Sequence, residues 1–344
     1  MKLSAGMCRR LSRRSFLGQT ALATVGLAAA GCVGGKIAPA PISGIASIAL
    51  SPDGHKIAAR FEDARTIVLY DWTTGEVTRI PHAPDTTMDY PAVSPDGQSL
   101  AFIQFDRQKR PGSVALVDLR TLETRILPGD QVTADFERFE PRFSPDGRRL
   151  VYGVQRIAAP NGIVLLDRDG APPRELLNPA LGFYSVSDFC FVAPNEILFQ
   201  GRAPRDSEFV EYIAALGRNK VDNVQYRLRF DAKPGPGFDR PEIMVPQLDP
   251  RPGNTADIRQ LCASRDGPQL AWLNDRAIFE RRDGLTTQVA GRTGLTFGCA
   301  ISSDGGTIAI TENPGLIDDY DLTILDRRTG AIIATHLLAK LRAS

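Results

Sequence analysis

The sequence has 344 residues, a formal net charge of +1 and only 3 histidines. The charge balance excludes the strongly basic surface that nucleic-acid-binding proteins need, and the length exceeds the roughly 250–300 residues at which single cores usually split. Several basic residues lie in the N-terminal segment, so the remainder of the chain is slightly acidic.

The first 31 residues read as an export signal and are excluded from the fold. The segment Ser12-Arg13-Arg14-Ser15-Phe16-Leu17 resembles a twin-arginine motif, with Arg13 and Arg14 as its signal, which implies a protein that folds before export. The apolar run over 21–30 is too short for a comfortable membrane span. It ends in Ala29-Ala30-Gly31-Cys32, which resembles a lipobox with Cys32 as lipid acceptor; an ordinary cleaved signal or an uncleaved anchor are the alternatives. We expect a periplasmic or cell-surface protein, anchored to the membrane through its N-terminus, with 32–43 as a spacer.

A four-residue turn then recurs along the chain. Proline sets its first corner, aspartate can accept from the backbone two residues on, and glycine takes the left-handed conformation that closes the loop. Between apolar runs, this pattern predicts a β-hairpin. The clear copies are Ser51-Pro52-Asp53-Gly54, Ser94-Pro95-Asp96-Gly97 and Ser144-Pro145-Asp146-Gly147, and the diverged copies are Ala193-Pro194-Asn195, Ser264-Arg265-Asp266-Gly267 and Ser302-Ser303-Asp304-Gly305.

Each hairpin is followed by a third apolar strand that ends near an acidic residue, a second turn and a fourth strand. In the first unit these segments are 66–71, 73–76 and 77–80. The units recur at roughly 40–50 residues, the length of one propeller blade, with one longer interval in the fourth. We predict an all-β chain: a six-bladed β-propeller of four-stranded antiparallel blades over 44–338, with blades near 44–82, 88–128, 138–178, 186–247, 258–290 and 296–338.

This pattern resembles the TolB-like propeller family, whose WD40-like repeats (also called PD40 repeats) carry a Ser-Pro-Asp-Gly turn followed by a Leu/Ile-Ala-Phe strand, as at Ser99-Leu100-Ala101-Phe102. The resemblance covers roughly residues 44–338 and implies the fold. The resemblance does not imply one particular activity, because proteins with such folds have many different activities. TolB itself has an α/β domain before its propeller, and related prolyl peptidases have a hydrolase domain. We expect neither here, and the sequence has no Gly-x-Ser-x-Gly elbow.

The repeated turns should all lie at one end of the propeller, and the longer loops at the other end, where we expect function to lie. The largest excursion is a predicted insertion in blade four, 201–223. Within it, 207–217 reads as a short helix with Phe209 on its apolar side and Tyr212 beside it. The helix either packs on the rim of the propeller or acts as a lid or partner-docking element.

Three carboxylates occur four or five residues before the turns of blades two, three and four: Asp89, Glu140 and Asp188. Arg259 has a comparable place in blade five. Near the axis, the carboxylates could converge at the channel mouth and bind a divalent cation. Alternatively, they form a solvated rim paired with Arg259.

Three cysteines, Cys190, Cys262 and Cys299, lie in the inner strands of blades four, five and six and match no zinc spacing. We predict buried free thiols, with a disulfide as the alternative in an oxidising compartment. The histidines lie in a turn or at strand ends, so a histidine-based triad is not expected.

These observations favour a monomeric, non-enzymatic propeller that acts as a binding or scaffold module for an envelope protein or a surface polysaccharide, with no nucleic-acid partner. One alternative is a metal-assisted carbohydrate-active enzyme, a lyase or hydrolase, that uses Asp89, Glu140 and Asp188 at the channel mouth. Another is a sensor domain that binds a small molecule in the channel.

Overall fold

The computed structural model divides into two compact units, Met1–Ala40 and Pro41–Ser344, which are considered separately. The structure describes residues 45–61, 66–106, 112–127, 136–156, 161–177, 183, 185–202, 224–230, 242–243, 259–264, 270–274, 277–282, 285–291, 295–313 and 321–337. The export signal, Cys32, Phe209, Tyr212 and the predicted helix lie outside these residues, so the expectations for them remain predictions.

The described residues form antiparallel four-stranded sheets, six in all. The first two sheets contain β1 (Ile45–Leu50), β2 (Lys56–Phe61), β3 (Ile67–Asp71), β4 (Val77–Arg79), β5 (Thr86–Val93), β6 (Ser99–Asp106), β7 (Ser113–Asp118) and β8 (Thr124–Ile126). The next two contain β9 (Phe136–Phe143), β10 (Arg149–Arg156), β11 (Gly162–Asp167), β12 (Arg174–Glu175), β13 (Ser185–Ala193), β14 (Glu196–Arg202), β15 (Val224–Arg229) and β16 (Glu242–Ile243). The last two contain β17 (Arg259–Ala263), β18 (Leu270–Asn274), β19 (Ala277–Arg282), β20 (Leu285–Gly291), β21 (Leu295–Ile301), β22 (Thr307–Asn313), β23 (Asp321–Asp326) and β24 (Ile332–Leu337).

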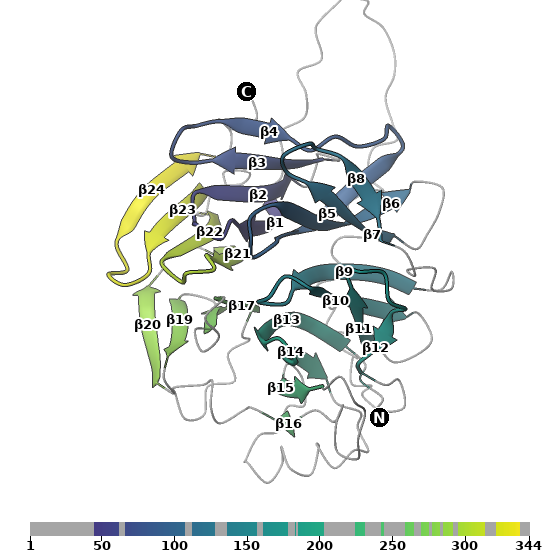
Figure 1. The fold of residues 1–344 in the computed structure, drawn as a ribbon. Helices are drawn as coiled ribbons and strands as arrows, with labels where there is room; N and C mark the ends of the chain where they lie inside the picture. Colours follow the sequence, from purple (N-terminus) through teal and green to yellow (C-terminus); the bar gives the residue numbers. More distant parts are fainter. Residues whose placement is uncertain are drawn as a thin grey trace, which may run out of the picture. The chain divides into compact units, whose positions relative to one another are not determined.

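Within every sheet, the strands lie side by side in chain order. The first strand of each sheet lies toward a common centre, and outer strands such as β4, β16, β20 and β24 lie at the rim (Figure 1). The first and last sheets share one core, in which Ile48 and Ile57 pack with Leu322 and Ile324. This arrangement is a β-propeller, as the repeated turns predicted.

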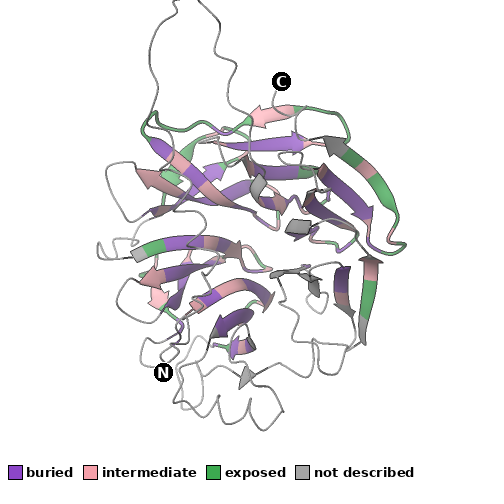
Figure 2. Cartoon of the chain, turned by 180° about the vertical axis from the view of Figure 1, so that it is seen from behind, coloured by how far each residue is buried: buried purple, intermediate pink, exposed green. Residues whose placement is uncertain are grey.

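The middle strands are apolar because neighbouring sheets cover both of their faces. Ile67, Val68, Leu69 and Tyr70 of β3 are all buried, whereas an ordinary half-exposed strand would alternate. The outermost strands face solvent: every residue of β8 is exposed, and Ile332 of β24 is 58% exposed. Figure 2 shows the buried residues concentrated in the inner and middle strands, with exposed ones on the outer strands and turns.

No helix occurs in the part of the chain that the structure describes. Accordingly, those residues include no helical segment with the length and apolar character needed to span a bilayer.

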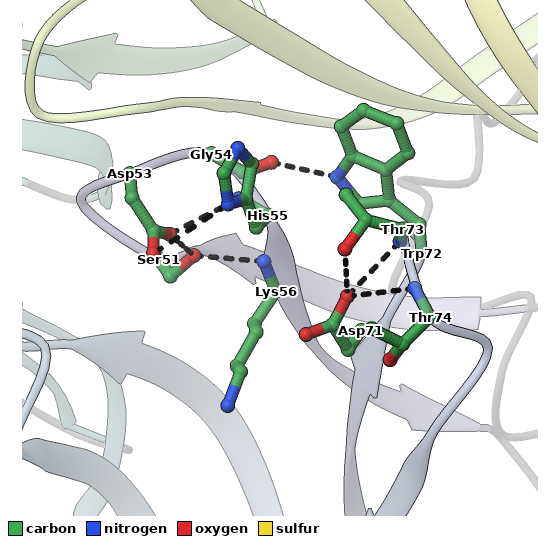
Figure 3. Close-up of polar contacts among 9 residues, drawn as sticks. All are labelled: Ser51, Asp53, Gly54, His55, Lys56, Asp71, Trp72, Thr73 and Thr74. Carbon is green, nitrogen blue, oxygen red and sulfur yellow. Dashed lines mark hydrogen bonds and ion pairs between the residues drawn. The ribbon is translucent and has the colours of Figure 1, made fainter.

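The repeated turn is closed by its own side chains, as Figure 3 shows for the first copy. Ser51 Oγ donates to Asp53 Oδ1 at 2.5 Å and accepts from Lys56 N at 2.8 Å. The same Asp53 oxygen accepts from His55 N at 3.1 Å. Gly54 has a φ of 74°, a left-handed conformation that most other residues avoid. The turn therefore needs a short hydroxyl, a carboxylate and a glycine in that order.

A second turn lies beside the first, between the third and fourth strands. Asp71 Oδ1 accepts from the backbone nitrogens of Thr73 and Thr74 and from Thr73 Oγ1 (Figure 3). Between them, Trp72 Nε1 donates to Gly54 O at 2.6 Å, so the indole ties the two turns together.

The serine–aspartate bond recurs in other sheets, in the pairs Ser94–Asp96, Ser144–Asp146 and Ser302–Asp304. Partial burial opposes ionisation of Asp53, Asp96 and Asp146, but hydrogen bonds from the serine and the backbone outweigh it, so each pKa lies below its usual value. These contacts confirm that the turn aspartates accept hydrogen bonds from the backbone two residues on, and they give these aspartates a structural role.

Replacing Asp146 with alanine should lower the free energy of unfolding by about 1–2 kcal/mol at pH 7, because Ser144 Oγ and Arg148 N lose a charged acceptor at a solvent-exposed turn. The pKa of Asp146 is lowered by folding, so its contribution is present above the unfolded value of about 4 and is lost as pH falls through the folded pKa. Urea denaturation at pH 7 and at pH 3 measures both effects. Asp85→Ala, at an exposed aspartate without a described hydrogen bond, is the control; an equal effect of the two changes would contradict this role.

Neighbouring sheets are also joined by arginines that follow the third strand. Arg168, after β11, donates from Nη1 to Gly147 O at 3.0 Å and from Nη2 to Ser99 Oγ of the preceding sheet at 3.1 Å. Arg327, after β23, donates from Nη1 to Glu280 Oε2 of the preceding sheet at 2.6 Å. The sheets are therefore joined by polar contacts near the turns as well as by apolar packing.

Candidate functional site

Each innermost strand contains an irregularity in its pairing with the second strand. In β5, β9 and β13 the irregularity includes a non-glycine residue with positive φ: Tyr90 (54°), Glu140 (49°) and Asp188 (49°). Each of them lies two positions before the residue at which pairing with the second strand resumes. Those residues are Ala92, Arg142 and Cys190. Bulges of this kind redirect side chains and are frequent next to functional sites.

Asp89, the first predicted site residue, is directed toward the first sheet. Its Oδ1 accepts from Ser47 Oγ at 3.2 Å and from Tyr90 N at 2.8 Å, and it lies 3.7 Å from Arg60 Nε. Burial raises the pKa of Asp89, although Arg60 and the two hydrogen bonds act in the opposite direction. Asp89 is thus largely buried beside Arg60 of the first sheet, a partner other than the Arg259 that the sequence suggested.

The structure does not gather the three predicted carboxylates into a metal site. Among the described residues, no three histidine, cysteine, aspartate or glutamate side chains form a group that could hold a metal ion. Glu140 and Asp188 lie at equivalent bulges in β9 and β13, whereas Asp89 precedes the corresponding residue of β5. Arg259 begins β17, and its side chain lies outside the described set. A role for these residues in binding therefore stays a prediction.

A cavity of about 130 Å³ lies instead where the innermost strands run into the repeated turns. Its described lining comes from all six sheets: Ile48, Ala49, Leu50, Pro91, Ala92, Val93, Pro95, Arg142, Phe143, Pro145, Cys190, Phe191, Ser264, Cys299, Ala300, Ile301 and Ser303. We call it the axial cavity. It lies at the end opposite to the loops where the sequence pointed to function.

The residues that line the axial cavity are mostly aliphatic, aromatic or proline. Arg142 is the only charged residue in the described lining, which contains no carboxylate and no histidine. Cys190 and Cys299 also line it; both are buried thiols that form no disulfide, as predicted, while the side chain of Cys262 lies outside the described set. Although most lining residues are apolar, the surface that they present to the cavity is more polar than apolar, so the site suits a small anion that Arg142 can bind.

Sequence reasoning missed Arg142, although a signal was present. Arg142 lies two residues before Ser144, so it falls at the end of an innermost strand, close to the axis. An arginine there interrupts the small and apolar residues at the matching strand ends, such as Ala49, Ala92 and Ala300.

The sheets around a common centre and the cavity between the ends of their inner strands define the class of protein: a β-propeller with an axial cavity. The fold is TolB-like. A putative TolB from Agrobacterium tumefaciens superposes with a TM-score of 0.52 at 14% identity, covering 79% of this chain and 87% of that one. An oligogalacturonate lyase from Vibrio parahaemolyticus superposes with a TM-score of 0.53 at 12% identity, covering 87% and 78%. At these identities the likeness shows the fold alone.

Sequence comparison gives a shorter match. Tricorn protease homolog 1 of Streptomyces coelicolor is 26% identical over 125 residues, which are 36% of this chain and 11% of that protein. No family model matches the sequence. The chain thus spans only a small part of this curated relative, and the relative's activity is not transferred.

Proposed function

We propose that this protein is an exported, lipid-anchored propeller that binds an envelope protein or a surface polysaccharide. The observation that carries the proposal is the arrangement of six sheets about a common centre, in which the described lining of the axial cavity has one arginine and lacks the carboxylate or histidine that acid–base catalysis usually uses. The TolB-like fold is consistent with a binding role. Export through the pair Arg13 and Arg14, with lipidation of Cys32, would place the propeller in the envelope.

The proposal includes a six-bladed ring closed within one chain, so the protein acts as a monomer. Two observations support closure. The first and last sheets share one apolar core, and the lining of the axial cavity includes residues from every sheet. A rigid ring would hold the loops opposite the turns in fixed positions, where a partner could contact several sheets at once.

The alternative is a metal-assisted carbohydrate-active enzyme, a lyase or hydrolase. The structural likeness to an oligogalacturonate lyase favours it, as do the carboxylates at the inner-strand bulges. In that case the site lies at the channel mouth, beyond the axial cavity, and completes its ligand set with residues outside the described ranges.

Crosslinking in intact envelopes, followed by affinity capture and mass spectrometry, tests the proposal. We expect recovery of one abundant envelope protein or polymer with the native protein. Cys32→Ser should release the protein from the membrane fraction, because the lipid acceptor is lost. The control is Arg13→Lys with Arg14→Lys, which should retain the unprocessed protein in the cytoplasm and abolish the crosslink.

Metal analysis of the purified protein separates the two functions. Stoichiometric metal, together with cleavage of an acidic polysaccharide that is lost on chelation and in Asp89→Ala, would establish the enzyme and reject the binding module. Capture of a partner by protein that has no metal and no such cleavage would do the reverse.

A further inference from the structure

We propose that the axial cavity binds a carboxylate group carried on a short apolar stem, with the Arg142 guanidinium as its anchor. This inference does not depend on the identity of the envelope partner, since it concerns the end of the propeller where the repeated turns lie. It rests on three observations: Arg142 has no carboxylate partner among the described residues, apolar residues lie beside it in the lining, and the cavity is small.

The described arginines that bridge strands are mostly paired with carboxylates. Examples are Arg60 with Asp89, Arg149 with Asp167, Arg156 with Glu175, Arg227 with Glu196 and Arg327 with Glu280. Arg142 differs from them. It is partly buried, and its only polar contact within the described part of the chain is from Nη1 to Pro141 O at 3.3 Å.

A guanidinium has five N–H donors, and its planar fork matches the two oxygens of a carboxylate. One long bond to a carbonyl leaves most of these donors to solvent or to a ligand. An anion that enters the cavity can accept hydrogen bonds from these donors, and such charge-assisted bonds are stronger than bonds between neutral groups. Arg142 therefore provides an anchor whose partner is supplied from outside the fold.

The remaining walls determine what the carboxylate is attached to. Pro91, Val93, Phe191 and Ile301 offer apolar contacts that a bare inorganic anion would not use. The cavity, at about 130 Å³, is larger than the roughly 10–15 Å³ that one water molecule requires on this measure, but it is too small for a nucleotide or a sugar chain. A stem of a few carbon atoms fits. The source can be a free short-chain acid or a glutamate side chain on a partner's projecting loop.

Ligand-observed NMR titration of the purified protein tests the proposal with isobutyrate and its neutral counterpart isobutyramide. We expect saturable binding of isobutyrate and at least about tenfold weaker binding of isobutyramide, because only the acid forms a charge-assisted bond. Arg142→Met should weaken isobutyrate binding at least about tenfold and leave isobutyramide unchanged. Arg142→Lys, which keeps the charge but not the planar fork, should retain part of the affinity.

Arg148→Met is the matched control, since Arg148 is an exposed arginine in the adjacent turn and does not line the cavity; it should bind isobutyrate as the native protein does. Melting curves of each variant separate loss of binding from loss of fold. Blocked peptides with a central Glu or Gln identify the source: binding of the Glu peptide alone points to a partner side chain, and binding of isobutyrate alone points to a free acid. The proposal is overturned if neither carboxylate binds saturably, if acid and amide bind equally, or if folded Arg142→Met binds isobutyrate as well as native protein.

Discussion

Replacing Phe199 with alanine is expected to lower the free energy of unfolding by about 3–5 kcal/mol, the usual effect of truncating a fully buried aromatic side chain. Phe199 of β14 stacks on Tyr226 of β15, with ring centroids 5.2 Å apart and planes 21° apart. Phe183 meets both rings edge-on, at 5.6 Å and 5.0 Å. This cluster belongs to the core between the third and fourth sheets, so the cavity left by truncation has rigid walls and cannot collapse fully.

Equilibrium urea denaturation followed by circular dichroism measures this change. Ile332→Ala, at an outer-strand residue that is 58% exposed, is the control and should alter stability by less than about 0.5 kcal/mol. Similar midpoints for the two variants would show that the aromatic cluster does not contribute to the stability of the sheets.

We expect a second large effect from Arg327→Met, which removes the positive charge of Arg327. This change should lower the free energy of unfolding by about 3–5 kcal/mol. Arg327 Nη1 lies 2.6 Å from Glu280 Oε2, and the two side chains are only 8% and 15% exposed. They join the last two sheets, so the single substitution leaves an unpaired carboxylate in a site that water barely reaches.

A double-mutant cycle identifies this cause. Adding Glu280→Leu to Arg327→Met should recover much of the lost stability, because the pair is then replaced by apolar groups. Arg229→Met is the control: Arg229 is 54% exposed and Glu196 keeps Arg227 as a partner, so the loss should stay below about 1 kcal/mol. Additive effects of the two core substitutions, within about 0.5 kcal/mol, would contradict a coupled pair.

The direction of a candidate site residue is harder to predict from sequence than the geometry of a turn, and Asp89 shows why. Its position in the sequence suggested a carboxylate near the axis, but the bulge at Asp89 and Tyr90 interrupts the alternation that would fix its direction. The side chain instead contacts Ser47 and Arg60 of the neighbouring sheet. No local pattern contains that information, because those partners lie in another sheet.

Arg142 is a different case, because nothing in the sequence around it predicted a role in ligand binding. In the sequence it is one arginine shortly before a turn. It becomes a candidate ligand-binding residue only because six strand ends enclose a cavity around it. The size of that cavity depends on how closely the sheets pack, which is set by side chains throughout the ring.

The sequence by itself determined the turns and, through their repetition, the four-stranded sheets. The serine, aspartate and glycine of each turn bond within a span of six residues, as from Ser51 to Lys56, so their chemistry is complete in a short segment. Only the tertiary structure decided the pairing of Arg327 with Glu280 and the enclosure of Arg142, since both depend on residues that are distant in the chain and meet only when the sheets pack around a common axis.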